Sequence, residues 1–295
     1  MYVIWGAAGT VGLATAKALR HASLPVRAVV RNAAQGDALA KLGCEVVVAD
    51  LHDALALART LDGAQAVQAL VPLPRGEARP ADTMRATIDG IARVLAAHRD
   101  VPVVALSDYG AELSENTGIT TLFHAFEAAL REVSSQLTLL RSAEHLHNWQ
   151  RVLPVALASG VLPSFHDPVD KSFPAIAAAD VGVVSARLLR EGGALRGTRL
   201  VSVEGPARVS ASDVARAIEK ASGRAVKARA LPRDQWEATL AQGGLSPQHA
   251  RLVIDLFDVH NAGRIDVETP ASERAFGTTT LEQAMAAMLG SNRAS

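Results

Sequence analysis

Short apolar segments and amphipathic segments alternate along the first half of the chain. Residues 2–5 (YVIW) are apolar, and residues 11–22 then carry apolar side chains at helical spacing. This pair of segments recurs about six times, and the last short segment is LTLLRS at residues 137–142. Strands rich in Val, Ile, Leu and Ala, without polar alternation, are typical of a sheet buried on both faces. The pattern predicts an α/β fold with a Rossmann-like, doubly wound parallel sheet.

The second half of the chain is less regular. Residues 142–167 show little periodicity, whereas residues 181–193, 210–224 and 246–263 have helical spacing. We predict that residues 1–141 form a cofactor-binding Rossmann-like domain. Residues 142–295 are expected to form a smaller α/β part that finishes the sheet, covers its carboxyl edge and binds substrate, with the chain crossing between the two.

A glycine-rich loop, GAAGTVG, joins the first predicted strand to the first predicted helix. This is the setting of a dinucleotide fingerprint, although the spacing is G-x-x-G-x-x-G. Gly6 permits a tight turn, Gly9 lets a diphosphate approach the backbone, and Gly12 lets the helix pack against the sheet. Free N–H groups at the helix N-terminus would bind the phosphates. A strand–helix turn without a ligand is the alternative. The predicted cofactor contacts in this loop are Gly6, Ala8, Gly9, Thr10, Val11 and Gly12.

The ends of the next strands predict which dinucleotide is bound. Arg31 ends the second strand, where an NAD-selective site carries an acidic residue for the ribose hydroxyls. An arginine there suits a 2′-phosphate through bidentate, charge-assisted contacts, and an ordinary surface arginine is the alternative. Asp50 would meet the adenine edge or cap the following helix. We therefore predict NADP(H) as the cofactor. Further residues expected to line it are Asp50, Leu51, Val71, Pro72 and Leu73.

These motifs resemble the NmrA-like family of atypical short-chain dehydrogenases. The segments that carry the resemblance are GAAGTVG, VVRN, ADLHD, LSDYGAE, HAFEAALREVSSQLTLLR, SFPAIAAADVGVVSARLL, the stretch over residues 197–232, and FGTTTLEQAM. The resemblance covers nearly the whole chain and implies an NADP(H)-binding half with a small C-terminal substrate half. The family includes quinone oxidoreductases, aromatic ether and isoflavone reductases, and non-catalytic regulators that sense nicotinamide cofactors.

The chain departs from ordinary short-chain dehydrogenases because it has no Y-x-x-x-K motif. Tyr109 is followed four residues later by Leu113. In the reductase branch of the family a lysine often occupies a helix position where this chain has His124. Quinone-reductase-like members are more similar, with a histidine followed three residues later by a glutamate, here Glu127. A quinone takes hydride at a conjugated system and its proton from solvent or a weak acid, so the departure argues against alcohol or sugar dehydrogenation.

Three residues are candidates for catalysis. His124 could donate a proton or hold the nicotinamide ribose, because an imidazole titrates near neutral pH; Glu127, one turn along, would orient it. A helix-surface histidine is the alternative. Ser107 and Tyr109 follow the fifth strand at the carboxyl edge, where ligands bind open α/β sheets. Their hydroxyls would reach substrate or ribose, or have plain loop roles. Arg141 is expected to form a structural salt bridge or to contact substrate.

The irregular segment contains further candidates. Trp149, Phe165 and Phe173 are predicted to wall an aromatic substrate pocket, and ordinary packing is the alternative. His145 and His147 would alternate faces on a strand, and no carboxylate–histidine set at metal spacing accompanies them. We therefore expect no metal site.

Composition narrows the partners. Thirty Lys and Arg residues balance 30 Asp and Glu residues. The chain therefore lacks the excess of basic residues that would predict nucleic-acid binding. No apolar run reaches the roughly 18–20 residues that span a bilayer. A single cysteine, Cys44, excludes an intramolecular disulfide and is expected to be a buried bystander thiol. We expect a cytoplasmic protein with a small-molecule partner, no membrane association, and a homodimer left open.

The preferred hypothesis is an NADPH-dependent oxidoreductase that reduces a quinone or a similar small conjugated acceptor. The alternative is a regulator that binds NADP(H), turns over nothing and passes its redox state to a partner. An isomerase or epimerase is a third interpretation, disfavoured by the missing tyrosine–lysine pair.

Overall fold

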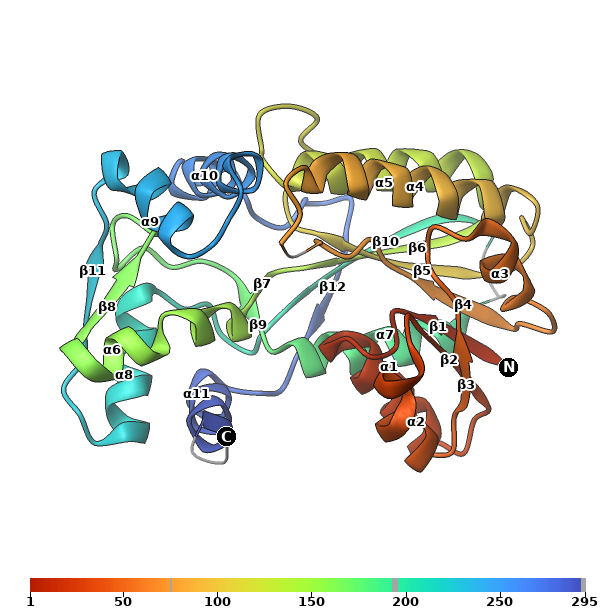
Figure 1. The fold of residues 1–295 in the computed structure, drawn as a ribbon, viewed down its shortest axis with the longest axis horizontal. Coiled ribbons are helices and arrows are strands. Elements are labelled where there is room, and N and C mark those ends of the chain that lie inside the picture. The colour runs from red at the N-terminus through yellow and green to blue at the C-terminus, as the bar shows by residue number, and fades with distance from the viewer. Residues whose placement is uncertain (75, 193–195, 293–295) are drawn as a thin grey trace.

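Eight parallel strands form the central sheet of the protein (Figure 1). The computed structural model describes residues 1–74, 76–192 and 196–292. The strand order is β12-β10-β6-β5-β4-β1-β2-β3, so the order reverses where β1 lies between β2 and β4. The predicted doubly wound, Rossmann-like sheet is confirmed. In such sheets ligands bind at the carboxyl ends of the strands beside this reversal. The strands of the sheet are β1 (Tyr2–Trp5), β2 (Val26–Val30), β3 (Glu45–Val48), β4 (Ala66–Ala69), β5 (Val103–Asp108), β6 (Gln136–Ser142), β10 (Gly197–Glu204) and β12 (Glu273–Phe276).

Helices cover both faces of this sheet, as Figure 1 shows. One layer holds α3, α4 and α5, and the other holds α1, α2 and α7. Side chains of β1 alternate between the two layers, since Val3 and Trp5 pack under the first and Ile4 under the second. This explains why the strand sequences are apolar throughout. The helices are α1 (Thr10–His21), α2 (Asp37–Lys41), α3 (Ala54–Arg59), α4 (Pro80–Ala96), α5 (Thr120–Val133) and α7 (Ala178–Glu191).

A close approach between α1 and α7 fixes the start of α1. A Cβ atom added at Gly182 of α7 would lie 2.5 Å from the Cβ of Ala14 and 2.7 Å from the carbonyl oxygen of Val11. Only glycine fits this distance without moving a helix. The N-terminal turn of α1, which follows the glycine loop, is therefore held in place by a helix from much later in the chain.

The later part of the chain has its own small sheets and helices. Strand β7 (Glu144–His145) pairs with β9 (Ala175–Ile176), and β8 (Val161–Ser164) pairs with β11 (Lys227–Ala230). Helix α7 and strands β10 and β12 also lie beyond residue 141, yet they belong to the large sheet and its cover. The remaining helices are α6 (Leu153–Ser159), α8 (Ala211–Ser222), α9 (Trp236–Gln242), α10 (Pro247–Asn261) and α11 (Leu281–Asn292), with short 3-10 turns at Ala33–Gly36, Leu146–Arg151 and Arg233–Gln235.

Within the described residues, no helix combines the length and the apolar character that crossing a membrane requires.

Candidate cofactor and substrate site

The glycine loop lies at the carboxyl end of β1, beside the reversal of strand order. Gly6 has a φ of +69°, a left-handed conformation that favours glycine. A Cβ atom at Gly12 would lie 2.4 Å from the carbonyl oxygen of Gly6, so α1 starts directly against the loop. Among the atoms of the described residues, a Cβ atom at Gly9 would have only that oxygen within 4 Å, at 3.4 Å. The loop therefore leaves open backbone at Gly9, where a ligand can approach.

The first turn of α1 carries no group that competes with an anion. Gly9 is its N-cap residue, no side chain among the described residues caps the helix, and the first turn contains no acidic residue. Ala8 and Thr10 are exposed and Val11 is partly buried. An uncapped helix start offers free N–H groups and the positive end of the helix dipole to a phosphate. The three glycines and their neighbours thus form a cradle that fits a diphosphate.

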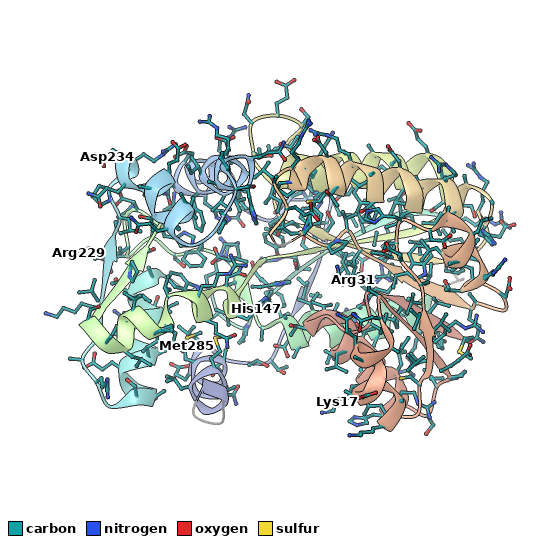
Figure 2. The ribbon with its side chains drawn as sticks, in the orientation of Figure 1. Lys17, Arg31, His147, Arg229, Asp234 and Met285 are labelled. Atoms are coloured by element: carbon teal, nitrogen blue, oxygen red, sulfur yellow. The ribbon has the colours of Figure 1, made fainter. Side chains whose placement is uncertain are left out.

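Arg31 follows β2 and is exposed (Figure 2). Within the described part of the chain, its guanidinium makes no hydrogen bond or ion pair. Asn32 caps the following turn by accepting a hydrogen bond from the Gln35 N–H at 3.2 Å. The charge of Arg31 is therefore available to a phosphate group near the end of β2.

The other predicted cofactor contacts lie at the ends of β3 and β4. The carboxylate of Asp50 is exposed and lies 3.1 Å from the Nδ1 of His52. Asp53, not Asp50, caps α3, so the helix-capping role considered for Asp50 is wrong. Leu51 and Leu73 are partly buried, Val71 is buried and Pro72 is exposed. These side chains follow the same edge of the sheet as the glycine loop, and their contact with a cofactor stays a prediction.

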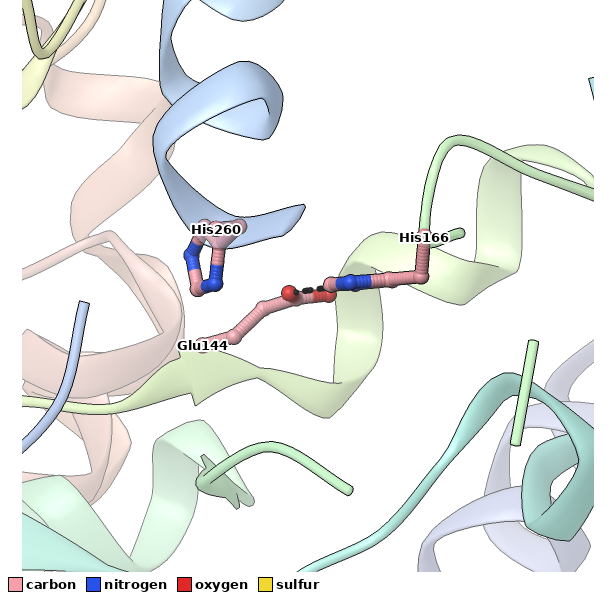
Figure 3. Close-up of side chains that lie close together, drawn as sticks. All are labelled: Glu144, His166 and His260. Carbon is pink, nitrogen blue, oxygen red and sulfur yellow. Dashed lines mark hydrogen bonds and ion pairs between the residues drawn. The ribbon is translucent and has the colours of Figure 1, made fainter. Parts of the chain in front are cut away.

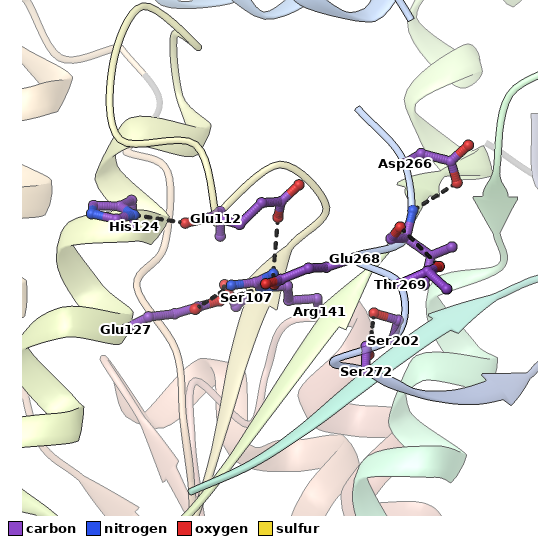
Figure 4. Close-up of polar contacts among 12 residues, drawn as sticks. Ser107, Glu112, His124, Glu127, Arg141, Ser202, Asp266, Glu268, Thr269 and Ser272 are labelled. Atoms are coloured by element: carbon purple, nitrogen blue, oxygen red, sulfur yellow. Dashed lines mark hydrogen bonds and ion pairs between the residues drawn. The ribbon is translucent and has the colours of Figure 1, made fainter. Parts of the chain in front are cut away.

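A buried ion network lies beyond β5 and centres on Arg141 (Figure 4). The Nε and Nη2 atoms of Arg141 each donate to the Glu127 carboxylate at 2.7 Å, and Nη1 donates to Glu112 at 2.9 Å and Glu268 at 2.5 Å. The hydroxyl of Ser107 donates to the same Glu127 carboxylate at 2.6 Å. Arg141 therefore forms the expected structural salt bridge, its contact with substrate stays a prediction, and the Ser107 hydroxyl is already engaged in this network.

His124 lies in the second turn of α5 and lines a cavity of about 500 Å³ next to Arg141. Its Nδ1 atom is 2.9 Å from the carbonyl oxygen of Ala111. The expectation that Glu127 orients His124 is wrong, because Glu127 binds Arg141 and Ser107 instead. His124 is partly buried, so its ring remains accessible from the cavity. Its catalytic role stays a prediction.

Tyr109 belongs to the hydrophobic core cluster that includes residues of α1 and α7, whereas His124 lines the cavity beside Arg141. Its side chain is buried, and its hydroxyl has no hydrogen-bond partner among the described residues. Burial and the nearby charge of Glu204 raise the pKa of the phenol. The three predicted catalytic residues are therefore not gathered around one point, and Tyr109 in this position is poorly placed to give up a proton.

Asp108, between Ser107 and Tyr109, was not among the predicted residues. It ends β5 at the carboxyl edge of the sheet. Burial and the charge of Glu144 raise the pKa of its carboxyl from 3.8 to about 7. A carboxyl group with this pKa can exchange protons near neutral pH. Its place at a strand end beside two predicted residues was a signal in the sequence, whereas the burial that shifts its pKa was not.

The three predicted aromatic residues lie around a histidine, His166. The ring of Phe173 stacks on His166 with centroids 3.9 Å apart, and Trp149 stacks at 5.9 Å. Phe165 lies further out, edge-on to Trp236 at 5.2 Å. Trp149 and Phe173 are buried, which agrees with packing. Their contact with substrate stays a prediction.

A second group of polar side chains meets at His166 (Figure 3). The Nε2 atom of His166 is 2.9 Å from a carboxylate oxygen of Glu144, and His260 completes a group whose polar atoms all lie within 4.8 Å of one another. Burial lowers the pKa of His260 to about 4. Residues 144, 166 and 260 are far apart in the sequence, so no spacing pattern indicated this cluster.

His145 and His147 do not belong to that cluster. The Nε2 atom of His145 is 3.1 Å from the Ser142 hydroxyl, and the two histidine rings lie 5.2 Å apart. Burial, with the charge of His147, lowers the pKa of His145 to about 4. The H-x-H pair therefore has partners of its own.

Comparison with known proteins shows the family to which the chain belongs. Residues 6–192 match a protein family described as NAD(P)H-binding. The chain belongs to this NAD(P)H-binding family. It is 24% identical over 258 residues to the NAD(P)H azoreductase of Xenophilus azovorans. The aligned region covers 87% of this chain and 86% of that protein. It is 24% identical to quinone oxidoreductase 2 of Escherichia coli (strain K12), over 99% of this chain and 100% of the relative.

Solved structures share the fold of this NAD(P)H-binding protein. The structure of an NADPH-dependent quinone oxidoreductase from Escherichia coli, complexed with NADPH, has a TM-score of 0.76 at 23% identity and covers 98% of this chain and 100% of that one. The resemblance to the NmrA-like group is confirmed. In this NAD(P)H-binding family member, the open backbone at Gly9 and the uncapped start of α1 are the features that fit the cofactor's diphosphate.

Proposed function

We propose that the protein is an NADPH-dependent reductase that transfers hydride to a quinone or a similar small conjugated acceptor. The observation that carries the proposal is the pairing of the glycine cradle with Arg31. The cradle suits a diphosphate, and the exposed guanidinium of Arg31, which has no ion-pair partner among the residues that the structure describes, follows the neighbouring strand. A 2′-phosphate on the adenosine ribose would give Arg31 its partner, which favours NADPH over NADH.

Two observations support a conjugated acceptor: the chain lacks the tyrosine–lysine pair, and its relatives are named for such acceptors. No lysine stands four residues after Tyr109, and the tyrosine hydroxyl is buried in the core. A site of this kind is poorly suited to alcohol chemistry, in which a tyrosine–lysine pair moves the hydroxyl proton. A conjugated acceptor does not need that pair. Both curated relatives, an azoreductase and a quinone oxidoreductase, are named for conjugated acceptors.

The chain's own residues would bind and orient the reactants. When bound, the reduced nicotinamide supplies the hydride. His124 faces the cavity at the start of α5 and would hold a polar group of the cofactor or deliver a proton to the reduced acceptor. Members of the Arg141 network line this cavity, and Glu127 of the network holds the Ser107 hydroxyl.

The proposal is tested by mixing the purified protein with NADPH and a panel of simple quinones and azo compounds while following the absorbance of the reduced cofactor. We expect saturable oxidation that scales with protein concentration. His124→Ala should lower kcat while cofactor binding is kept. His98→Ala is the matched control. The Nδ1 atom of His98 also contacts a backbone carbonyl oxygen, at 2.8 Å against 2.9 Å for His124, but His98 lies two residues after the end of α4.

Tight NADPH binding without turnover of any acceptor would refute the proposed reductase activity. The second candidate function, an NADP(H)-sensing regulator, would then remain. One structural observation favours this second candidate, since the hydroxyl of Ser107 is bound to Glu127 and that of Tyr109 is buried. Equal loss of activity in His124→Ala and His98→Ala would remove the role assigned to His124.

A further inference from the structure

The Glu144, His166 and His260 side chains converge from three separate segments. Glu144 lies in β7, His166 follows β8, and His260 lies near the end of α10. Each offers one nitrogen or carboxylate oxygen, and these three atoms all lie within 4.8 Å of one another (Figure 3). One carboxylate and two imidazoles form a donor set that binds divalent transition metals, zinc in particular.

The cluster is held in place by its surroundings. The ring of His166 is stacked on Phe173, and its backbone N–H donates to the Ser164 hydroxyl at 2.9 Å. The end of α10 is tied to the segment after β8, because Lys171 donates to the carbonyl oxygen of Asn261 at 2.6 Å and Asn261 donates to the carbonyl oxygen of Phe165 at 2.8 Å. These bonds keep His260 beside His166 without using either ring.

His260 differs from the other two ligands in its hydrogen bonding. The ring nitrogens of His260 make no hydrogen bond within the described part of the chain, and its ring stands edge-on to that of His166 with centroids 5.6 Å apart. The Glu144–His166 contact alone would be an ordinary ion pair, but it leaves His260 unexplained. Glu144 and His260 are only partly buried.

We propose that Glu144, His166 and His260 bind a divalent transition-metal cation of the zinc class. Tetrahedral bonds of about 2.0–2.1 Å place neighbouring ligand atoms roughly 3.3 Å apart. The Glu144–His166 separation of 2.9 Å is close to that value, and the ligand atom of His260 lies within 4.8 Å of both. Three protein ligands leave a coordination position for water or for an oxygen atom of a bound small molecule. The site is independent of the proposed reductase activity.

The test uses the full-length, tag-free protein after treatment with a chelator. Zinc chloride is titrated by calorimetry, and cobalt(II) is added in parallel because its visible spectrum reports coordination geometry. We expect one equivalent of zinc to bind and the cobalt spectrum to be that of a four-coordinate site. Loss of a residue that only hydrogen-bonds a metal ligand lowers metal affinity by roughly 10- to 100-fold. His260→Ala and Glu144→Gln each remove a ligand itself, so each should weaken zinc binding by more than that.

Two controls separate this site from adventitious binding. His52→Ala removes an exposed histidine that lies 3.1 Å from a carboxylate, and His145→Ala removes a neighbouring histidine outside the set. Both should bind zinc as the wild type does, with unchanged circular dichroism in all four variants. The proposal is overturned if one equivalent of zinc does not bind saturably, or if His260→Ala binds it undiminished. Loss of binding in His52→Ala alone would also overturn it, since the zinc would then lie on the surface.

Discussion

Asp108 is predicted to make the stability of the protein fall as the pH rises from acid to neutral. Burial, followed by the charge of Glu144, raises the pKa of the Asp108 carboxyl from its ordinary 3.8 to about 7. The folded protein therefore binds more protons than the unfolded chain between these two values. Under this condition the free energy of unfolding decreases with increasing pH.

The magnitude follows from the two pKa values. A full difference between 3.8 and about 7 corresponds to roughly 4 kcal/mol at high pH. Part of this loss has already occurred at pH 5, so the change from pH 5 to pH 8 amounts to roughly 2.5 kcal/mol. Asp108→Asn removes the titrating group and keeps the shape of the side chain, so the variant should not show this part of the pH dependence.

The assay is urea unfolding followed by circular dichroism at several pH values between 5 and 8, in the presence of a chelator. The free energy of unfolding of Asp108→Asn minus that of the wild type cancels the titration of all other groups. We expect this difference to increase with pH in favour of the variant. Asp89→Asn, an exposed residue on α4, serves as the control and should give a difference that does not change with pH. The same flat result for Asp108→Asn would refute the reasoning.

Three further substitutions test other parts of the account. Gly12→Ala places a methyl group 2.4 Å from a loop carbonyl oxygen, so NADPH affinity measured by fluorescence titration should fall and stability should drop by roughly 1–3 kcal/mol. Gly290→Ala in α11, whose methyl group would meet no atom of the described residues within 4 Å, is the control and should keep NADPH affinity unchanged without lowering stability. Arg31→Asp should weaken NADPH by roughly 10- to 150-fold, the loss of a 1.5–3 kcal/mol charged hydrogen bond, and leave NADH nearly unaffected; equal effects on the two would contradict the 2′-phosphate role. Glu127→Ala leaves buried Arg141 without its bidentate partner and should cost roughly 3 kcal/mol in urea unfolding, and a loss below about 1 kcal/mol would show that the other carboxylates compensate.

The sheet could be predicted from the sequence because strands that are buried on both faces have continuous apolar sequences. Val3, Ile4 and Trp5 pack alternately into two cores, so β1 is apolar throughout. The glycine loop could be predicted for the same kind of reason, since Gly6 and Gly12 satisfy backbone geometry that few other residues allow. Local sequence determines both features.

The polar part of the site depends on contacts between distant segments, which leave no periodic pattern. Glu127 lies one helical turn from His124, yet Arg141 on β6 takes its carboxylate instead. The Arg141 network also recruits Glu268, which lies 127 residues away in the chain. Likewise, His166 and His260 meet because α10 is tied to the segment after β8. Such arrangements follow from tertiary packing and could not be read from spacing.

A single-turnover experiment tests most directly whether the protein transfers hydride from NADPH to a conjugated acceptor. Protein at a concentration above that of NADPH is mixed rapidly, under anaerobic conditions, with a simple benzoquinone, and the absorbance of the reduced cofactor is followed alongside a reaction without protein. We predict a protein-dependent, saturable loss of that absorbance that is faster with NADPH than with NADH. Bound NADPH that is oxidised no faster than in the protein-free reaction, with the quinone and with every other acceptor, would contradict the account.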